Sequence, residues 1–443
     1  MNPRTTVPIL PILLALSLPA LAAPAADKPE LPLPPALPGG AEHLEVAGGS
    51  LLQRPDGFDP NVAIASAPPE VTFRFYPGQD HPGSPWSHWG DGSVSGGIYY
   101  SAIGDHQKPK GTALVYAYDP ADKALRTLVD IRKFLEESDA LAEDENYTSG
   151  KVHTRIEMGS DGWLYYAGHR GSTQTTDDAH GFRGERVFRT DPEGGTTEIV
   201  SAFPIAKHII PTGMLDAERM LYYGGTAAGD DAPDQGVWLF VLDLKSGEIL
   251  LRAKDGPKRC ALLSRTTGNL YWDGRRYDPN TNTISDAPGV PPIRSASAET
   301  ADGTIYFTSD KSSEIFAFDV EDESVRPLGD AGVGQATYTT SLDIDPTGRY
   351  LYLVPGAHGQ AAKDGTPVVQ FDTESGRSKV LCFLVEPLRE AAGYTPTGTF
   401  SSALSEDGGT LFVTWNGYRD DAPTEWDVCA LTEIRIPESE RQP

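Results

Sequence analysis

A strand pattern that recurs seven times limits the possible folds of this chain more than any other feature of its sequence. Each unit has a short apolar strand, a glycine-containing turn, a strand that ends in aromatic residues, a third strand that closes on aspartate, and a fourth strand. The second unit shows the first two strands, with His153 near the start of one and His169 at the end of the other. The seven units cover residues 94–131, 151–200, 220–243, 269–279, 302–319, 350–372 and 409–434.

The spacing of these units predicts the architecture. It is about 40–50 residues, the period of four-stranded propeller blades. The last unit has only three strands, and the upstream strand at 71–76 can supply the fourth and close the ring. We therefore predict an all-β fold, a seven-bladed β-propeller with four-stranded blades, over residues 66–437. Two β-sandwiches are the alternative, which the unbroken series of seven similar units disfavours.

The N-terminal segment reads as a targeting sequence. Arg4 precedes the apolar run 7–18, and small residues at 20–22 fit a cleavage site. We expect residues 1–22 to be a signal peptide, 23–65 a proline-rich linker and N-terminal extension, and 438–443 a tail. The mature protein is then exported, to the periplasm or the extracellular space, and it has no membrane span and is a monomer.

Charge and missing motifs exclude several classes of function. A net charge of −26 should repel nucleic acid, so no nucleic-acid partner is expected. No haem-attachment motif, glycine-rich phosphate loop or tryptophan-docking motif occurs, so no haem, nucleotide or quinone cofactor is expected. Three cysteines do not form a disulfide framework. Buried thiols are the expected state, with a Cys382–Cys429 pair as the alternative.

Histidines concentrate where a propeller carries its sites. In such a ring the innermost strand of each blade begins at the face where the second strand ends, so the loops at these points share one rim. His153 and His169 should approach each other there, with His106 from the neighbouring blade beside them. Eight of the nine histidines are expected on this rim: His81, His88, His106, His153, His169, His180, His208 and His358.

The chain also resembles known propellers. Its Asp-Gly-x-Leu-Tyr and Tyr-Asp-Pro cues, over about residues 70–437, are similar to those of the secreted seven-bladed propellers of the quinoprotein-like and YVTN-like group. That resemblance implies architecture alone. The blade with two histidines resembles that of some propeller polysaccharide lyases, in which a His and a Tyr perform β-elimination and an Arg neutralises a uronate carboxylate.

The second resemblance implies roles for particular residues. His153 or His169 would be the base, Tyr338 the acid, and Arg170 or Arg294 the partner of the carboxylate. The substrate would be a polysaccharide.

Two alternatives stay open at this point. In one, His106, His153 and His169 bind a divalent metal ion that takes the role of the arginine. In the other, the propeller is not an enzyme and binds a glycan, a peptide or a protein through the same rim.

Overall fold

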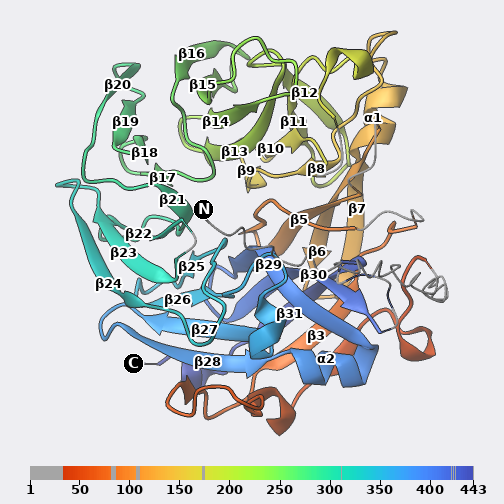
Figure 1. The fold of residues 1–443 in the computed structure, drawn as a ribbon, viewed down its shortest axis with the longest axis vertical. Coiled ribbons are helices and arrows are strands. Elements are labelled where there is room, and N and C mark those ends of the chain that lie inside the picture. Colours follow the sequence, from red (N-terminus) through yellow and green to blue (C-terminus); the bar gives the residue numbers. More distant parts are fainter. Residues whose placement is uncertain are drawn as a thin grey trace, which may run out of the picture.

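The computed structural model describes residues 33–80, 86–105, 110–171, 175–310, 312–420, 422, 424 and 426–442. The predicted signal peptide lies outside these residues, so export stays a prediction. Seven antiparallel sheets surround a central axis, each forming one blade (Figure 1). The predicted seven-bladed β-propeller is confirmed.

The first four blades follow the chain in order. Blade 1 contains β4 (Ser93–Ser95), β5 (Ile98–Gly104), β6 (Ala113–Asp119) and β7 (Ala124–Asp130). Blade 2 contains β8 (Lys151–Val152), β9 (Glu157–Met158), β10 (Leu164–His169), β11 (Arg186–Thr190) and β12 (Thr197–Ala202). Blade 3 contains β13 (His208–Asp216), β14 (Leu221–Ala228), β15 (Trp238–Asp243) and β16 (Ile249–Lys254). Blade 4 is the smallest and contains β17 (Leu262–Leu263), β18 (Leu270–Trp272), β19 (Arg275–Asp278) and β20 (Thr283–Asp286).

The last three blades complete the ring. Blade 5 contains β21 (Ile293–Ala296), β22 (Thr304–Ser309), β23 (Glu314–Asp319) and β24 (Val325–Asp330). Blade 6 contains β25 (Asp343–Ile344), β26 (Tyr350–Leu353), β27 (Pro367–Asp372) and β28 (Arg377–Phe383). Blade 7 contains β29 (Tyr394–Leu404), β30 (Thr410–Arg419), β31 (Val428–Arg435) and the N-terminal strand β3 (Glu70–Phe75).

The ring closes as the sequence predicts. Strand β3 pairs with β31 in antiparallel register, so the two ends of the propeller meet within one sheet. Two short strands from the N-terminal extension, β1 (Leu44–Val46) and β2 (Ala63–Ile64), then add to the outer edges of blades 7 and 6. Covering these edges removes unpaired backbone groups that could join another sheet.

Apolar side chains fill the spaces between blades. Of the eight buried hydrophobic clusters among the described residues, seven lie between blades, one at each boundary. The cluster between blades 7 and 1, for example, joins Tyr99 and Tyr116 to Phe412 and Leu431. This packing makes the ring a rigid frame, so the loops at the axis can hold polar residues in fixed positions.

Two α-helices connect blades. Helix α1 (Ile131–Glu137) begins after Asp130, whose carboxylate accepts a hydrogen bond from the Lys133 amide. It ends at Glu137, and Asp139 two residues later adopts a left-handed backbone with φ of 53°. Helix α2 spans Val385–Ala392 and ends at Gly393, whose backbone is also left-handed. No helix in the described part of the chain is long and apolar enough to cross a membrane.

The inner edge of blade 2 is broken where His153 lies. Strands β8 and β9 both pair with β10, and residues 153–156 between them leave the sheet. The Thr154 hydroxyl replaces one missing ladder bond by accepting from the Ala167 amide at 2.9 Å. The Ile156 amide donates to the Asp91 carbonyl instead of to its own sheet. His153 therefore follows the first strand segment rather than beginning a continuous strand.

The cysteines are free thiols. Cys382 and Cys429 are fully buried and unpaired, as the expectation of buried thiols states, and no disulfide joins them. Cys260 is only partly buried, and it faces the axis beside the site described next.

Candidate functional site

Two histidines stack on each other at the rim of blade 2. The ring centroids of His153 and His169 lie 4.9 Å apart, with 29° between the ring planes. His153 Nδ1 lies 2.9 Å from the Pro211 carbonyl oxygen, and His169 Nδ1 lies 2.7 Å from that of Arg170. A carbonyl oxygen can only accept, so each Nδ1 carries the hydrogen and each Nε2 keeps a lone pair when the ring is neutral.

Both imidazoles are held in this neutral form. Burial lowers the pKa of His153 well below its usual value, and the charges of Lys151 and Arg259 add to the effect. Burial and the charge of Lys151 lower the pKa of His169 in the same direction. Two neutral imidazoles, each with a lone pair at Nε2, are therefore present at neutral pH.

Arg259 faces the first of these bases. Its Nη1 donates to His153 Nε2 at 3.3 Å, across 106 residues of sequence. His169 Nε2 accepts no hydrogen bond from any residue that the structure describes. Burial and the charge of Arg294 lower the pKa of Arg259, which the charges of Tyr338 and Asp310 oppose.

Lys151 lies on the same strand face as the histidine pair. Only 6% of the residue is exposed, and its Nζ is 4.5 Å from the centre of the Trp89 ring. Among the described residues it has no hydrogen-bond acceptor and no ion pair. Burial and the charges of Arg170 and Arg259 lower the pKa of Lys151 to about 7.

Aromatic rings form one wall of the site beside Arg294. The Arg294 Nε donates to the Tyr338 hydroxyl oxygen at 2.5 Å, and its guanidinium lies 5.0 Å from that ring centre. The His358 ring stacks on Tyr338, and Trp89 packs on Phe400 with centroids 4.7 Å apart. Flat apolar faces beside polar groups are suited to sugar rings.

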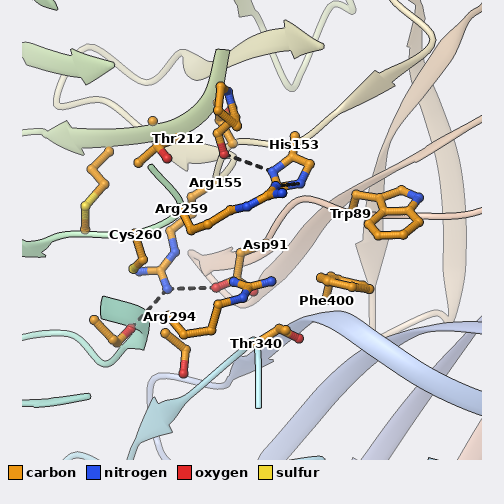
Figure 2. A pocket seen from close by; sticks show the side chains of 16 residues that line it. Trp89, Asp91, His153, Arg155, Thr212, Arg259, Cys260, Arg294, Thr340 and Phe400 are labelled. Atoms are coloured by element: carbon orange, nitrogen blue, oxygen red, sulfur yellow. Dashed lines mark hydrogen bonds and ion pairs between the residues drawn. The ribbon is translucent and has the colours of Figure 1, made fainter. Parts of the chain in front are cut away.

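These side chains enclose two connected pockets on the axis. The mouth pocket, with a cavity volume of about 490 Å³, is lined by Trp89, Lys151, His153, His169, Arg170, Ile209, Pro211, Thr226, Ala227, Val237, Lys258 and Arg259. The inner pocket, with a cavity volume of about 60 Å³, shares His153 and Arg259 and extends to Asp91, Thr212 and Arg294 (Figure 2).

The mouth pocket is basic in a strongly acidic protein. Four cationic side chains line it, namely Lys151, Arg170, Lys258 and Arg259, and none of its lining residues is acidic. The chain as a whole carries a net charge of −26. Positive charge gathered in one concave place attracts anions even when the rest of the surface repels them.

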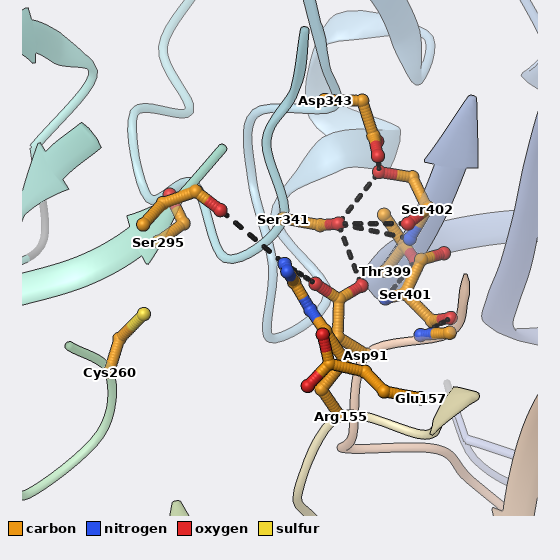
Figure 3. A network of polar contacts seen from close by, with 12 residues as sticks. Asp91, Arg155, Glu157, Cys260, Ser295, Ser341, Asp343, Thr399, Ser401 and Ser402 are labelled. Carbon is orange, nitrogen blue, oxygen red and sulfur yellow. Dashed lines mark hydrogen bonds and ion pairs between the residues drawn. The ribbon is translucent and has the colours of Figure 1, made fainter. Parts of the chain in front are cut away.

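A network of paired polar groups, which includes Asp91 and Arg155 from the lining of the inner pocket, joins several blades near the axis (Figure 3). Arg155 donates to the Asp91 carboxylate at 2.8 Å and to the Ala296 carbonyl at 3.4 Å. Ser341 donates to the other Asp91 oxygen, and Ser402 donates to Asp343. The members come from blades 2, 5, 6 and 7 and from the segment that leads into blade 1, so this axial network ties most of the ring together.

Protonation in the axial network is shifted toward neutral carboxyls. Burial raises the pKa of Asp343 to about 7, and the nearby charge of Asp91 acts in the same direction. Burial also raises the pKa of Asp91 itself, although its ion pair with Arg155 limits the change. The network therefore keeps its own charges balanced, unlike the mouth pocket.

The residues that the sequence predicts to be catalytic all lie in or next to the two pockets. His153, His169 and Arg170 line the mouth pocket, Arg294 lines the inner pocket, and Tyr338 is bonded to Arg294. His106, expected beside the pair, lies outside the described residues.

The surroundings of the two imidazoles are a poor fit for a divalent metal. The Nδ1–H bonds to carbonyls leave each Nε2 lone pair for a ligand, but basic side chains rather than carboxylates surround the rings. Within the described ranges no three His, Cys, Asp or Glu side chains group as metal ligands. The positive charges of neighbouring Lys and Arg side chains repel a bound cation, so the reaction proposed for this site uses no metal ion.

The sequence placed Arg259 and Trp89 on the rim without a catalytic role, and it gave no role to Lys151. A signal for Lys151 existed, because it precedes His153 by two residues and alternate residues of a strand share a face. Arg259 could be expected on the rim where the chain leads into blade 4. Its contact with His153 depends on the closure of the whole ring.

Comparison with known proteins supports the fold. No family model matches the chain, and no curated protein sequence matches it. A chain of a mitotic checkpoint complex is similar, with 12% identity, a TM-score of 0.52, and coverage of 87% of this chain and 97% of that one. An oligogalacturonate lyase in complex with manganese gives 12% identity, a TM-score of 0.50, and coverage of 91% and 100%. A luciferin-regenerating enzyme gives 12% identity, a TM-score of 0.43, and coverage of 84% of this chain and 96% of that one. At such identity the first two likenesses concern the fold alone.

Proposed function

We propose that this propeller binds a carboxylate-bearing saccharide in the mouth pocket and cleaves it by β-elimination. One observation carries the proposal: Lys151 and Arg259, which have no carboxylate within ion-pair distance among the described residues, lie beside a neutral imidazole, His153, whose lone pair faces Arg259 at 3.3 Å. A carboxylate is the ligand that such a set of cations lacks, and a neutral imidazole is the base that removal of a carbon-bound proton requires.

Arg259 links recognition to proton removal. A carboxylate that binds its guanidinium takes over the hydrogen bond now made to His153 Nε2, and so frees the lone pair. The carbon next to the carboxylate then lies beside that lone pair. Pairing of the carboxylate with arginine stabilises the negative charge that develops when the proton leaves, so both effects lower the same barrier.

The reaction balances with these residues alone. His153 Nε2 takes the proton from the carbon next to the carboxylate, and the electron pair forms a double bond to the following carbon. The carbon–oxygen bond to the next sugar breaks, and Tyr338 gives its hydroxyl proton to the leaving oxygen. Arg294, which donates to that hydroxyl at 2.5 Å, positions Tyr338 for this transfer.

The ring faces at the site are suited to a saccharide. Trp89 and Phe400 border the inner pocket together with hydroxyl groups, including Thr212. The Thr212 hydroxyl is buried and has no hydrogen-bond partner within the described chain. A sugar hydroxyl that enters the pocket would satisfy it.

The test is cleavage of uronate polymers, such as polygalacturonate, alginate and hyaluronan, followed by the ultraviolet absorbance of the new double bond. His153→Ala should reduce kcat by about 10²–10⁴-fold. His43→Ala is the matched control, because His43 lies on the N-terminal extension, where it faces Glu45. A chelator should leave the rate unchanged. Full activity of His153→Ala would refute the proposed base, and uronate binding without cleavage would reduce the function to recognition.

Location belongs to the proposal as well. The targeting sequence at residues 1–22 supports export of the mature protein, where extracellular or periplasmic saccharides are accessible. Intact mass of the protein recovered from its native host should match a chain that begins at about residue 23. A full-length cytoplasmic protein would contradict this part.

A further inference from the structure

The Lys151 amine is the least satisfied charged group of the mouth pocket. It is 6% exposed, and its Nζ contacts the face of Trp89 without an acceptor or a counter-ion in the described part of the chain. The backbone at its base is closely packed, since a Cβ on Gly104 would lie 2.8 Å from the Lys151 Cβ. The side chain therefore lies between the wall of the channel and the pocket, where a ligand is the partner it lacks.

The groups that face this amine favour its neutral form. Arg170, Arg259 and Lys258 are the cations of the same pocket, and His153 and His169 are uncharged. Burial and the two arginine charges lower the pKa of the amine to about 7. A lysine that is desolvated or placed next to other cations becomes a nucleophile at neutral pH.

The pocket also offers what an attack on a carbonyl requires. Arg170 and Arg259, whose charges act on Lys151, can bind a carboxylate next to the Lys151 amine. His169 Nε2 has a free lone pair and can accept and return protons. A cavity volume of about 490 Å³ leaves room for a small acid next to the amine. A small acid with a carbonyl adjacent to its carboxylate could contact the arginines, the Lys151 amine and His169 at the same time.

We propose that Lys151 is a nucleophilic amine that forms an imine with a small 2-oxo acid, whose carboxylate binds Arg170 and Arg259. The Nζ lone pair forms a bond to the carbonyl carbon, and the oxygen takes a proton that leaves the nitrogen. Loss of water from this carbinolamine gives the C=N bond, with His169 transferring the protons. No oxidant or reductant takes part. The inference rests on the anion-binding half of the proposed function and not on the elimination.

Reductive trapping tests this activity in the full mature chain. The protein is incubated at about pH 7 with glyoxylate and cyanoborohydride, which reduces an imine to a stable secondary amine, and the adduct is located by peptide mass spectrometry. We expect one dominant adduct, on Lys151, formed at glyoxylate concentrations about tenfold below those that label other lysines. Lys151→Arg should lose it. Lys245→Arg, on an exposed turn of blade 3, should keep it.

Two results would overturn the proposal. One is labelling spread evenly over exposed lysines, and the other is no label on Lys151 although glyoxylate binding is seen by calorimetry. Peptide mapping of the wild-type protein decides this even if Lys151→Arg fails to fold. Acetaldehyde, which has the carbonyl but no carboxylate, should label Lys151 much less than glyoxylate, and equal labelling would count against the arginine contact. Uronate cleavage is measured without glyoxylate or reductant, so failure of the elimination is seen separately.

Discussion

The mouth pocket and the axial network are both charged, both lie on the axis of the propeller, and differ in one respect. In the axial network Arg155 has the Asp91 carboxylate at 2.8 Å, with the charge of Glu157 also acting on it. In the mouth pocket the basic groups Lys151 and Arg259 have no carboxylate within ion-pair distance among the described residues. The network is complete without a ligand, whereas the pocket is complete only with one.

The contrast separates a structural use of charge from a functional one. A buried pair adds little net stability, but removing one partner leaves an uncompensated charge and destabilises strongly. An unpaired cation has the opposite property, because its removal relieves repulsion and desolvation. Substitutions in the two regions should therefore change stability and ligand binding in opposite patterns.

Arg155→Met should have the largest effect. It leaves the Asp91 carboxylate buried near Asp343 without its cation, so we expect the free energy of unfolding to fall by about 3–5 kcal/mol. Denaturant unfolding followed by tryptophan fluorescence measures this. The exposed pair of Arg275 with Asp255 provides the control, and Arg275→Met should cost about 0–1 kcal/mol. Equal losses in both variants would show that the axial network is no more important than a surface pair.

Arg259→Ala should give the reverse pattern. Repulsion from Arg294 and Lys151 disappears, so the free energy of unfolding should stay the same or rise. Affinity for an oligouronate should fall by about 10–100-fold, or about 1.4–2.8 kcal/mol, because a hydrogen bond to a charged group is lost. Calorimetric titration beside thermal unfolding measures both. A variant that unfolds more easily and binds normally would place Arg259 with the structural charges.

Asp343→Asn tests the network through pH. The pKa of Asp343 is raised to about 7 in the folded state, so this group costs stability as pH rises from about 4 to about 7, and the cost persists above that range. Asparagine keeps an acceptor for Ser402 but cannot ionise. The free energy of unfolding of the variant, relative to that of the wild type, should therefore rise by about 1–2 kcal/mol as the pH is raised from about 5 to about 8. The exposed Asp56→Asn should show a difference that does not change with pH.

The sequence predicted the ring better than the site, for a physical reason. Strand alternation, Asp-Gly turns and the repeat period are local properties, so the seven blades and the closing strand at 71–76 could be read directly. His153 and His169 could also be brought together, since both lie at strand ends of one blade. Their contact depends on one pair of strands and on nothing farther away.

Contacts across the axis could not be derived in this way. Arg259 is 106 residues from His153, and Asp91 is 64 residues from Arg155. Each pair meets only because seven blades of particular width close into a ring. No local sequence pattern predicts that Arg155 pairs with a carboxylate and that Arg259 does not. That difference distinguishes the axial network from the mouth pocket.

Salt concentration should change ligand affinity at the mouth pocket more than it changes the stability of the axial network, and this is the smallest of the expected effects. Affinity for an oligouronate at the mouth pocket should fall a few-fold, or about 0.5–1 kcal/mol, between about 0.05 M and 0.5 M sodium chloride, because added ions screen a partly exposed site. The unfolding free energy that Arg155 contributes should change much less, since the Asp91 and Arg155 side chains are only 15% and 22% exposed and contact each other directly. Titrations and unfolding curves at the same salt concentrations measure both. An equal loss, in kcal/mol, of the Arg155 contribution to stability and of the oligouronate affinity would show that ions screen both regions alike. The mouth pocket would then not differ from the axial network in its access to solvent.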